Sequence, residues 1–194
     1  MHGRGWETHQ RDYADLEHSA QEILVSQNAW IPGLLQTAAY TSYLLDAVVA
    51  LDQDAIGAAV RGRIERQKVL YQRDTHLHVG LTEAVLRHRM GGAVIMAEQL
   101  RRLADLSRLP TVELGVIPAD TDMPSRYGAS FDLFEHLDGR DDDSIVIVEL
   151  EAGEVREGDP ERVRAYRVRR RSRARARGSD LRLAHAAWCF ALRE

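Results

Sequence analysis

The chain has 194 residues, of which 44% are hydrophobic and 29% are charged, with a formal net charge of −4 at pH 7. These values are typical of a globular domain and exclude wholesale disorder. No apolar run approaches the ~20 residues of a membrane span, the first residues lack the apolar core of a signal peptide, and the one cysteine, Cys189, cannot form an internal disulfide. We therefore expect a cytoplasmic protein with no membrane partner.

The predicted elements, in chain order, begin with a flexible N-terminus over residues 1–12. Helical spacing of apolar residues predicts helices over 13–28, 37–51 and 52–72, the last with Asp52 as its N-cap. A strand over 77–81, helices over 83–89 and 94–109, and strands over 112–116, 130–137 and 145–150 follow. Asp159 and Pro160 open a last helix. This order indicates one α+β domain over 13–166, in which N-terminal helices and a C-terminal helix pack with a roughly four-stranded mixed or antiparallel sheet.

The C-terminal segment 167–194 is rich in arginine. Nine arginines lie between Arg162 and Arg177 with no acid among them, which leaves −13 for the rest of the chain. Arginines of such a segment gain binding free energy when they contact the phosphates of a nucleic acid. The segment lacks interleaved aromatic residues for base stacking, however, and a solvated tail has the same composition. Because the body of the chain is acidic, we expect no direct, specific DNA binding.

Polar residues on the buried stripe of the 52–72 helix are the strongest candidates for a site. Arginines there either form buried ion pairs that position two elements, or bind a carboxylate or phosphate in a pocket. Aromatic and amide side chains near the Pro32-Gly33 turn would supply walls, unless they are ordinary core residues. The candidate ligand-binding residues are Trp30, Gln36, Tyr40, Arg63, Arg66 and Gln67.

Metal and cofactor chemistry finds little support in the sequence. His76 and His78 lie on one face of a strand, but nothing places a third ligand such as His88, His136 or Glu149 beside them, so we expect a polar strand face and no metal. The sequence has no Gly-rich phosphate loop followed by lysine, no dinucleotide-binding glycine pattern and no nucleophile elbow. We expect no cofactor.

Several short motifs occur in an order that resembles one family. They are Trp30–Tyr40 (WIPGLLQTAAY), Arg63–Leu70, Thr82–Arg87, Gln99-Leu100, Val116–Pro118, Phe131–Leu133 and Val148-Glu149. From about Asp15 to Tyr166 the chain resembles the actinobacterial domain of unknown function that follows an Xre-type helix-turn-helix in Scr-type, toxin–antitoxin-like regulators. The roughly 60 residues that a DNA-binding domain needs do not precede the match. Arginines at 169–171 replace the apolar stripe of the family's last helix.

The resemblance implies a stand-alone ligand- or partner-binding regulatory module without its own DNA-binding domain. Its partner would be a small molecule, a full-length regulator or a toxin-like protein, and it could form a homodimer. The alternative is a cofactor-independent enzyme that catalyses cyclisation, isomerisation or proton transfer on a small natural-product intermediate. Glu83 or Glu149 would then be the catalytic acid or base, with Arg63 stabilising negative charge. A third interpretation is a remnant that only dimerises.

Overall fold

The computed structural model describes residues 3–49, 53–121, 129–150 and 153–175. Its helices are α1 (Gly3–Ser19), α2 (Ala38–Leu44), α3 (Gln53–Arg66), α4 (Glu83–Arg87), α5 (Gly92–Leu106) and α6 (Pro160–Arg175). Its strands are β1 (Glu22–Gln27), β2 (His76–Thr82), β3 (Val112–Ile117), β4 (Phe131–Glu135), β5 (Ser144–Leu150) and β6 (Gly153–Glu157). Single helical turns of 3-10 or π type are η1 (Gly33–Leu35), η2 (Leu45–Val49), η3 (Gln67–Tyr71) and η4 (Leu137–Gly139). The fold is α+β, as predicted.

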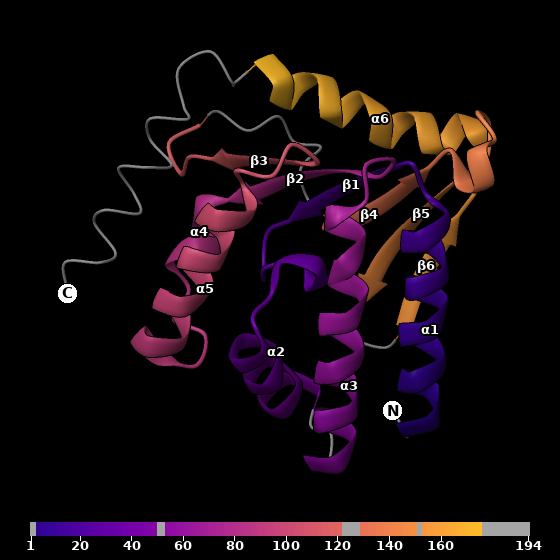
Figure 1. Cartoon of the computed structure of the whole chain (residues 1–194). Helices are drawn as coiled ribbons and strands as arrows, with labels where there is room; N and C mark the ends of the chain where they lie inside the picture. The colour runs from indigo at the N-terminus through magenta and orange to yellow at the C-terminus, as the bar shows by residue number, and fades with distance from the viewer. Residues whose placement is uncertain (1–2, 50–52, 122–128, 151–152, 176–194) are drawn as a thin grey trace.

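The six strands form one mixed sheet in the order β3-β2-β1-β4-β5-β6. β1, β2 and β3 are parallel, whereas β4, β5 and β6 form an antiparallel meander that joins the sheet at β1. The two parallel crossovers run in the same direction, so their helices lie on the same face of the sheet. Figure 1 shows α1 to α5 gathered on that face, and α6 alone on the opposite face.

Both faces of the sheet are packed. On the side of α1–α5, the core includes Ile23, Phe134 and Ile147, and the ring of Tyr13 meets that of Phe134 edge-on at 5.9 Å. On the side of α6, a smaller cluster forms from Leu24, Phe131, Leu133, Val146 and Val163. β1 therefore has apolar residues buried on both of its faces.

The main difference from the sequence-based expectation lies at β1. We expected a helix over 13–28, but the helix ends at Ser19 and residues 22–27 form a central strand. The apolar run 23–25 is buried on both faces of the sheet, and such a run cannot be told from a helical segment by its periodicity. β6 was also missed, so the sheet has six strands where roughly four were expected. Residues 3–12, expected to precede the first helix, form its first turns.

The other elements lie close to their predicted places. Thr37 caps α2 by accepting a hydrogen bond from the Tyr40 amide at 3.2 Å. The predicted cap Asp52 lies outside the described residues. α6 begins at Pro160 as predicted, and the Asp159 carboxylate accepts hydrogen bonds from the amides of Glu161 and Arg162. The Arg-rich segment continues α6 as far as residue 175, and the rest of that segment lies beyond the described residues.

Candidate functional site

Gln36 lies at the centre of a buried hydrogen-bond network beside the Pro32-Gly33 turn. Its side chain is 2% exposed. The amide Nε2 donates to the Ile31 carbonyl at 2.6 Å, and Oε1 accepts from the Thr41 hydroxyl at 2.9 Å and from Arg63 Nη1 at 2.8 Å. Three elements are joined through this one side chain, namely the turn, α2 and α3.

Two further glutamines extend this network to α5. Gln67 Nε2 donates to the Gln36 carbonyl at 2.6 Å, and Gln67 Oε1 accepts from Arg102 Nη2 at 3.1 Å. Gln99 donates to the Leu35 carbonyl at 2.8 Å and accepts from the Thr37 amide at 2.7 Å. Both of these Gln99 bonds end on the backbone beside the turn, and sequence reasoning did not assign Gln99 a role.

The aromatic candidates take different positions. Tyr40 is buried, its hydroxyl accepts a hydrogen bond from the Ile31 amide at 3.3 Å, and burial raises its pKa. Trp30 is 37% exposed and lies at the surface. Gln36, Tyr40 and Gln67 therefore hold the turn in place, while Arg63 and Arg66 reach a second group of polar residues.

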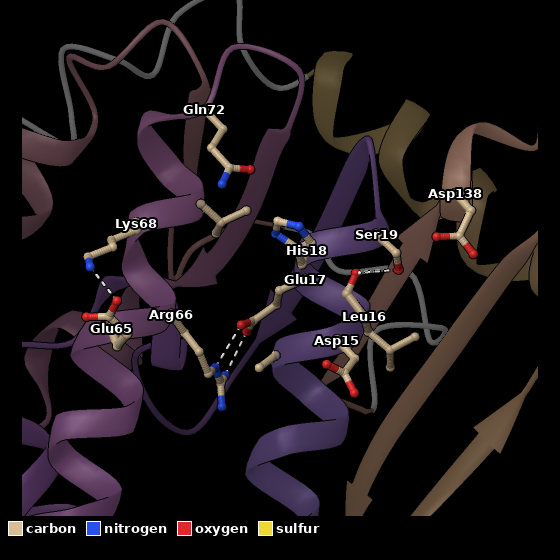
Figure 2. Close-up of a pocket in the computed structure, with 12 residues that line it drawn as sticks. Asp15, Leu16, Glu17, His18, Ser19, Glu65, Arg66, Lys68, Gln72 and Asp138 are labelled. Atoms are coloured by element: carbon tan, nitrogen blue, oxygen red, sulfur yellow. Dashed lines mark hydrogen bonds and ion pairs between the residues drawn. The ribbon is translucent and has the colours of Figure 1, made fainter.

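Arg66 forms a two-point ion pair with Glu17 between α3 and α1. Its Nε and Nη2 each lie 2.7 Å from a carboxylate oxygen of Glu17, as Figure 2 shows. The two side chains are only 10% and 5% exposed. The guanidinium also stacks 5.6 Å from the centre of the Tyr13 ring. Tyr13 and Glu17 are one helical turn apart, so one face of α1 supplies both contacts.

The sheet presents a row of polar residues to the same helices. Asp132 of β4 pairs with Val25 of β1 and Ile147 of β5, which both pack in the helix-side core. Cross-strand partners share a face of the sheet, so the Asp132 side chain also points toward the helices. There the Gln27 side chain hydrogen-bonds it.

Glu149, two residues beyond Ile147 on β5, continues this row and is exposed, so the row reaches the surface. Glu154 of β6 pairs with Glu149 in the sheet register. We call the following residues the charged cluster: Tyr13, Glu17, Gln27, Arg63, Arg66, Asp132, Glu149 and Glu154.

The electrostatics of the charged cluster are strongly perturbed. Burial, together with the Glu149 and Glu17 carboxylates, raises the pKa of Asp132 to about 8. Burial, with Arg66 close by, lowers the pKa of Arg63 to about 10. Burial also raises the pKa of Glu17, and the Arg66 guanidinium counteracts that rise. The pKa of Tyr13 is raised by burial and then by Asp132 and Glu149.

Several buried polar atoms of the charged cluster have no hydrogen-bond partner among the described residues. They include Nε of Arg63, Oδ1 of Asp132 and Oε1 of Gln27. Arg63 is 8% exposed, and its guanidinium packs so closely on Gly33 that a Cβ there would lie 3.3 Å from Nε. Most buried polar groups in folded proteins are paired, so these atoms need an explanation.

An open groove of about 680 Å³ borders the charged cluster on the outside. It runs between the C-terminal end of α1 and the end of α3 with η3, and Glu17 and Arg66 are among its lining residues (Figure 2). The lining also includes Asp15, His18 and Lys68, so the groove is polar. The Glu17–Arg66 pair therefore separates this groove from Arg63 and Asp132.

The proposed catalytic carboxylates Glu83 and Glu149 are not brought together. Glu83 begins α4 directly after β2, and Glu149 lies near the end of β5. β1 and β4 lie between these strands, which separates them by about 14 Å. Glu83 accepts hydrogen bonds from the Ala119 amide at 2.9 Å and from Arg87, and these bonds lower its pKa.

The histidine pair does not form a metal centre in the part of the chain that the structure describes. His78 Nδ1 lies 2.7 Å from Glu113 Oε2 on the neighbouring strand. His88 and His136 contact the Ala29 carbonyl and Asp141 instead. Over all described ranges, no three His, Cys, Asp or Glu side chains are grouped to hold a metal ion. Nor does any helix within those ranges have the length and apolar character needed to cross a membrane.

Fold and site together define an α+β domain with a mixed sheet and a buried charged cluster at the carboxyl edge of its parallel strands. Residues 10–179 match a family described as "Domain of unknown function (DUF5753)". The match covers most of the chain, which therefore belongs to this family. Neither a curated protein nor a solved structure matches the chain.

Sequence reasoning found the arginines and Glu149 of the charged cluster, but it did not find Glu17, Asp132 or Glu154. Asp132 alternates with apolar residues along β4, which is typical of a solvent-facing position, but both faces of this sheet are covered. Glu17 was not among the candidate residues. The signal that could have found it is that Tyr13 and Glu17, four residues apart, share one face of their helix, as Arg63 and Arg66, three residues apart, do on theirs.

Proposed function

We propose that this chain is a ligand-binding regulatory module whose charged cluster takes a small polar molecule. The observation that supports this is that buried polar atoms without a hydrogen-bond partner, Arg63 Nε, Asp132 Oδ1 and Gln27 Oε1 among them, lie within one group of polar and ionisable residues. A cluster that only joined helices to the sheet would gain most by pairing every polar atom. Unsatisfied buried groups with perturbed pKa values are instead typical of sites that bind or react.

The place of the charged cluster in the sheet supports the same proposal. Gln27, Asp132 and Glu149 lie at the edge where the parallel strands β1 and β2 end. In sheets with parallel strands, ligands bind outside the carboxyl ends of the strands, at the point where the connection direction changes. Here the direction changes at β1, between the parallel strands and the antiparallel meander.

We further propose how binding is transmitted. The resemblance to the domain that follows an Xre-type helix-turn-helix in Scr-type regulators supports a role in the cytoplasm through a partner, either a full-length regulator, a toxin-like protein or a second copy. Arg63 belongs to the charged cluster and also bonds Gln36, which holds the turn between β1 and α2. A ligand that binds Arg63 would therefore act on the packing of α2 and α5.

Native mass spectrometry of the protein purified from its own host tests the proposal. We expect a mass excess of a few hundred daltons that is retained in Asp105→Asn and lost in Asp132→Asn. Asp105 is an exposed aspartate that pairs with Arg108 on α5, so it is a matched control. A bare mass for the wild type, together with no thermal stabilisation by host metabolite extract, would contradict the proposal.

A second candidate function is cofactor-free acid–base catalysis on a small natural-product intermediate. It is favoured by Asp132 and Glu149, two neighbouring carboxyls in different environments: Asp132 is half-buried, with its pKa raised to about 8, and Glu149 is exposed. Such pairs divide the roles of acid and base. Incubation of the released ligand with enzyme would show turnover that Asp132→Asn and Glu149→Gln abolish. Turnover that depends on Glu83 instead would place the chemistry elsewhere.

A further inference from the structure

We propose that the molecule bound by the charged cluster carries a positively charged nitrogen, an ammonium or a guanidinium, that lies against Asp132, and an oxygen acceptor that binds Arg63. This inference rests on the proposed function and specifies its ligand class. It follows from the sign of the charges around Asp132 and from the partners already held by the two arginines.

The charged cluster holds more acid than base. Four carboxyl groups, those of Glu17, Asp132, Glu149 and Glu154, accompany two guanidinium groups. Arg66 donates two hydrogen bonds to the Glu17 carboxylate. A third guanidinium, that of Arg156, lies on the same face of the sheet opposite Ile147, and it bonds Glu154 and also Asp12 at 3.1 Å.

Asp132 has no arginine of its own among the described residues. Its one side-chain partner is the neutral amide of Gln27, and its Oδ1 is buried and unbonded. The groups that face it are Tyr13 and Glu17 from α1, Arg66 from α3, Gln27 from β1 and Glu149 from β5. The nearest charges are thus mostly negative, and a buried carboxyl among negative charges favours any cation that reaches it.

Arg63 supplies the second contact. It is 8% exposed, its Nη1 is bonded to Gln36, and its Nε remains a donor without an acceptor. The Glu149 and Glu17 carboxylates influence the pKa of Arg63 and also that of Asp132, so the two residues share the same acidic neighbours. A hydroxyl or carboxylate oxygen on the ligand would complete the bonding of Arg63.

An organic cation explains these features better than a metal ion. Metal ions need several ligating side chains around one point, and the described residues offer no group of three that could hold one. An ammonium needs only one carboxylate and a few acceptors, and the Tyr13 ring, which already packs against the Arg66 guanidinium at 5.6 Å, adds an aromatic face of the kind that attracts cations.

The test uses three probes of similar size and different charge: ethanolamine, ethylene glycol and glycolate. Each is titrated into the full chain at constant ionic strength while NMR follows the Gln27 side-chain amide and the Arg63 Nε–H. We expect saturable shifts of both signals with ethanolamine alone. In Asp132→Asn, the ethanolamine affinity should fall about 10- to 100-fold, the effect of losing one charge-assisted hydrogen bond. Asp105→Asn should bind like the wild type.

The pH dependence of binding gives an independent readout. Binding of a cation requires ionised Asp132, so ethanolamine affinity should rise between pH 6 and pH 8 and binding should release protons. Glu149→Gln provides a second variant should Asp132→Asn fail to fold, and it should also weaken ethanolamine binding.

Saturable binding of glycolate in preference to ethanolamine, or ethanolamine binding that Asp132→Asn and Glu149→Gln leave intact, would overturn the inference. So would no saturable ethanolamine binding at all. A host-derived ligand without a basic nitrogen would also overturn it, while the proposed function would stand. The proposed function itself fails only if the chain from its host is bare and unaffected by extract, so the two failures are distinguishable.

Discussion

Replacing Asp132 by asparagine should change how the stability of the protein depends on pH. In the folded protein the Asp132 carboxyl has a pKa of about 8, because it is buried among negative charges, whereas in the unfolded chain it titrates near 4. Between these values the folded state binds one proton more than the unfolded state. The free energy of unfolding therefore falls as pH rises through this window.

The size of the effect follows from the same linkage. Each pH unit inside the window costs about 1.4 kcal/mol, so the wild type should lose at most about 3 kcal/mol through Asp132 between pH 5.5 and 7.5. Asparagine has nearly the shape of the protonated acid and does not titrate. Asp132→Asn should thus be more stable than the wild type throughout this range, and its margin should widen by up to about 3 kcal/mol from pH 5.5 to pH 7.5.

Urea denaturation at several pH values measures this directly, with Asp105→Asn as the exposed control that should follow the wild-type curve. Glu17 also has a raised pKa and remains in both proteins, so the difference between the two curves isolates Asp132. Parallel curves for wild type and Asp132→Asn would refute the reasoning. They would mean that Asp132 is ionised in the folded protein.

Three further changes test the packing around the site, each by chemical denaturation at pH 7. Glu17→Gln should cost about 3–5 kcal/mol by leaving the Arg66 charge buried without its partner, and adding Arg66→Met should recover much of the loss; no recovery would contradict a buried ion pair. Gln36→Leu should cost about 3 kcal/mol, because two hydrogen-bond donors and the Ile31 carbonyl lose their partner; a loss below about 1 kcal/mol would mean that the turn is held by other contacts. Gly91→Ala should lower the free energy of unfolding by about 1–2 kcal/mol, because φ of Gly91 is 69° and the new Cβ would lie 2.6 Å from Ile95. As a control, the new Cβ of Gly62→Ala inside α3 meets nothing within 4 Å, so this change should be neutral or stabilising.

Local periodicity predicted three of the four expected strands and every helix after the first, whose expected second half is strand β1. β4 was also located, although its expected span was longer at both ends. β1 was missed because its run Ile23-Leu24-Val25 extends the apolar stripe of the preceding helix, and only the presence of two covering layers makes it a strand. β6 was missed because apolar and polar side chains alternate only weakly along it. It is a strand because it pairs with β5, and its own sequence gives little sign of this.

The site divides in the same way. Arg63, Arg66 and Gln67 were predictable because charged residues interrupt an apolar helical stripe. Their partners come from elements distant in sequence, such as Glu17, 49 residues from Arg66. Some polar residues, such as Gln99, bond only to the backbone, and others reach Asp132. The difference depends on the register of the strands and on the order of the layers, and the sequence of a single helix or strand contains neither.

The pairing of β1 with β4 joins two stretches of chain that are more than 100 residues apart in sequence. Next to this pairing, the Asn28 amide donates a hydrogen bond to the Ser130 hydroxyl at 3.2 Å, over a similar separation in sequence. Loop closure over such a distance is slow, so the parallel half and the meander should each form before this seam closes. Gln27 and Asp132 lie on opposite sides of the seam. A ligand that needs both residues binds only to chains that have completed the last step of folding, and its binding would distinguish finished molecules from half-assembled ones in the cell.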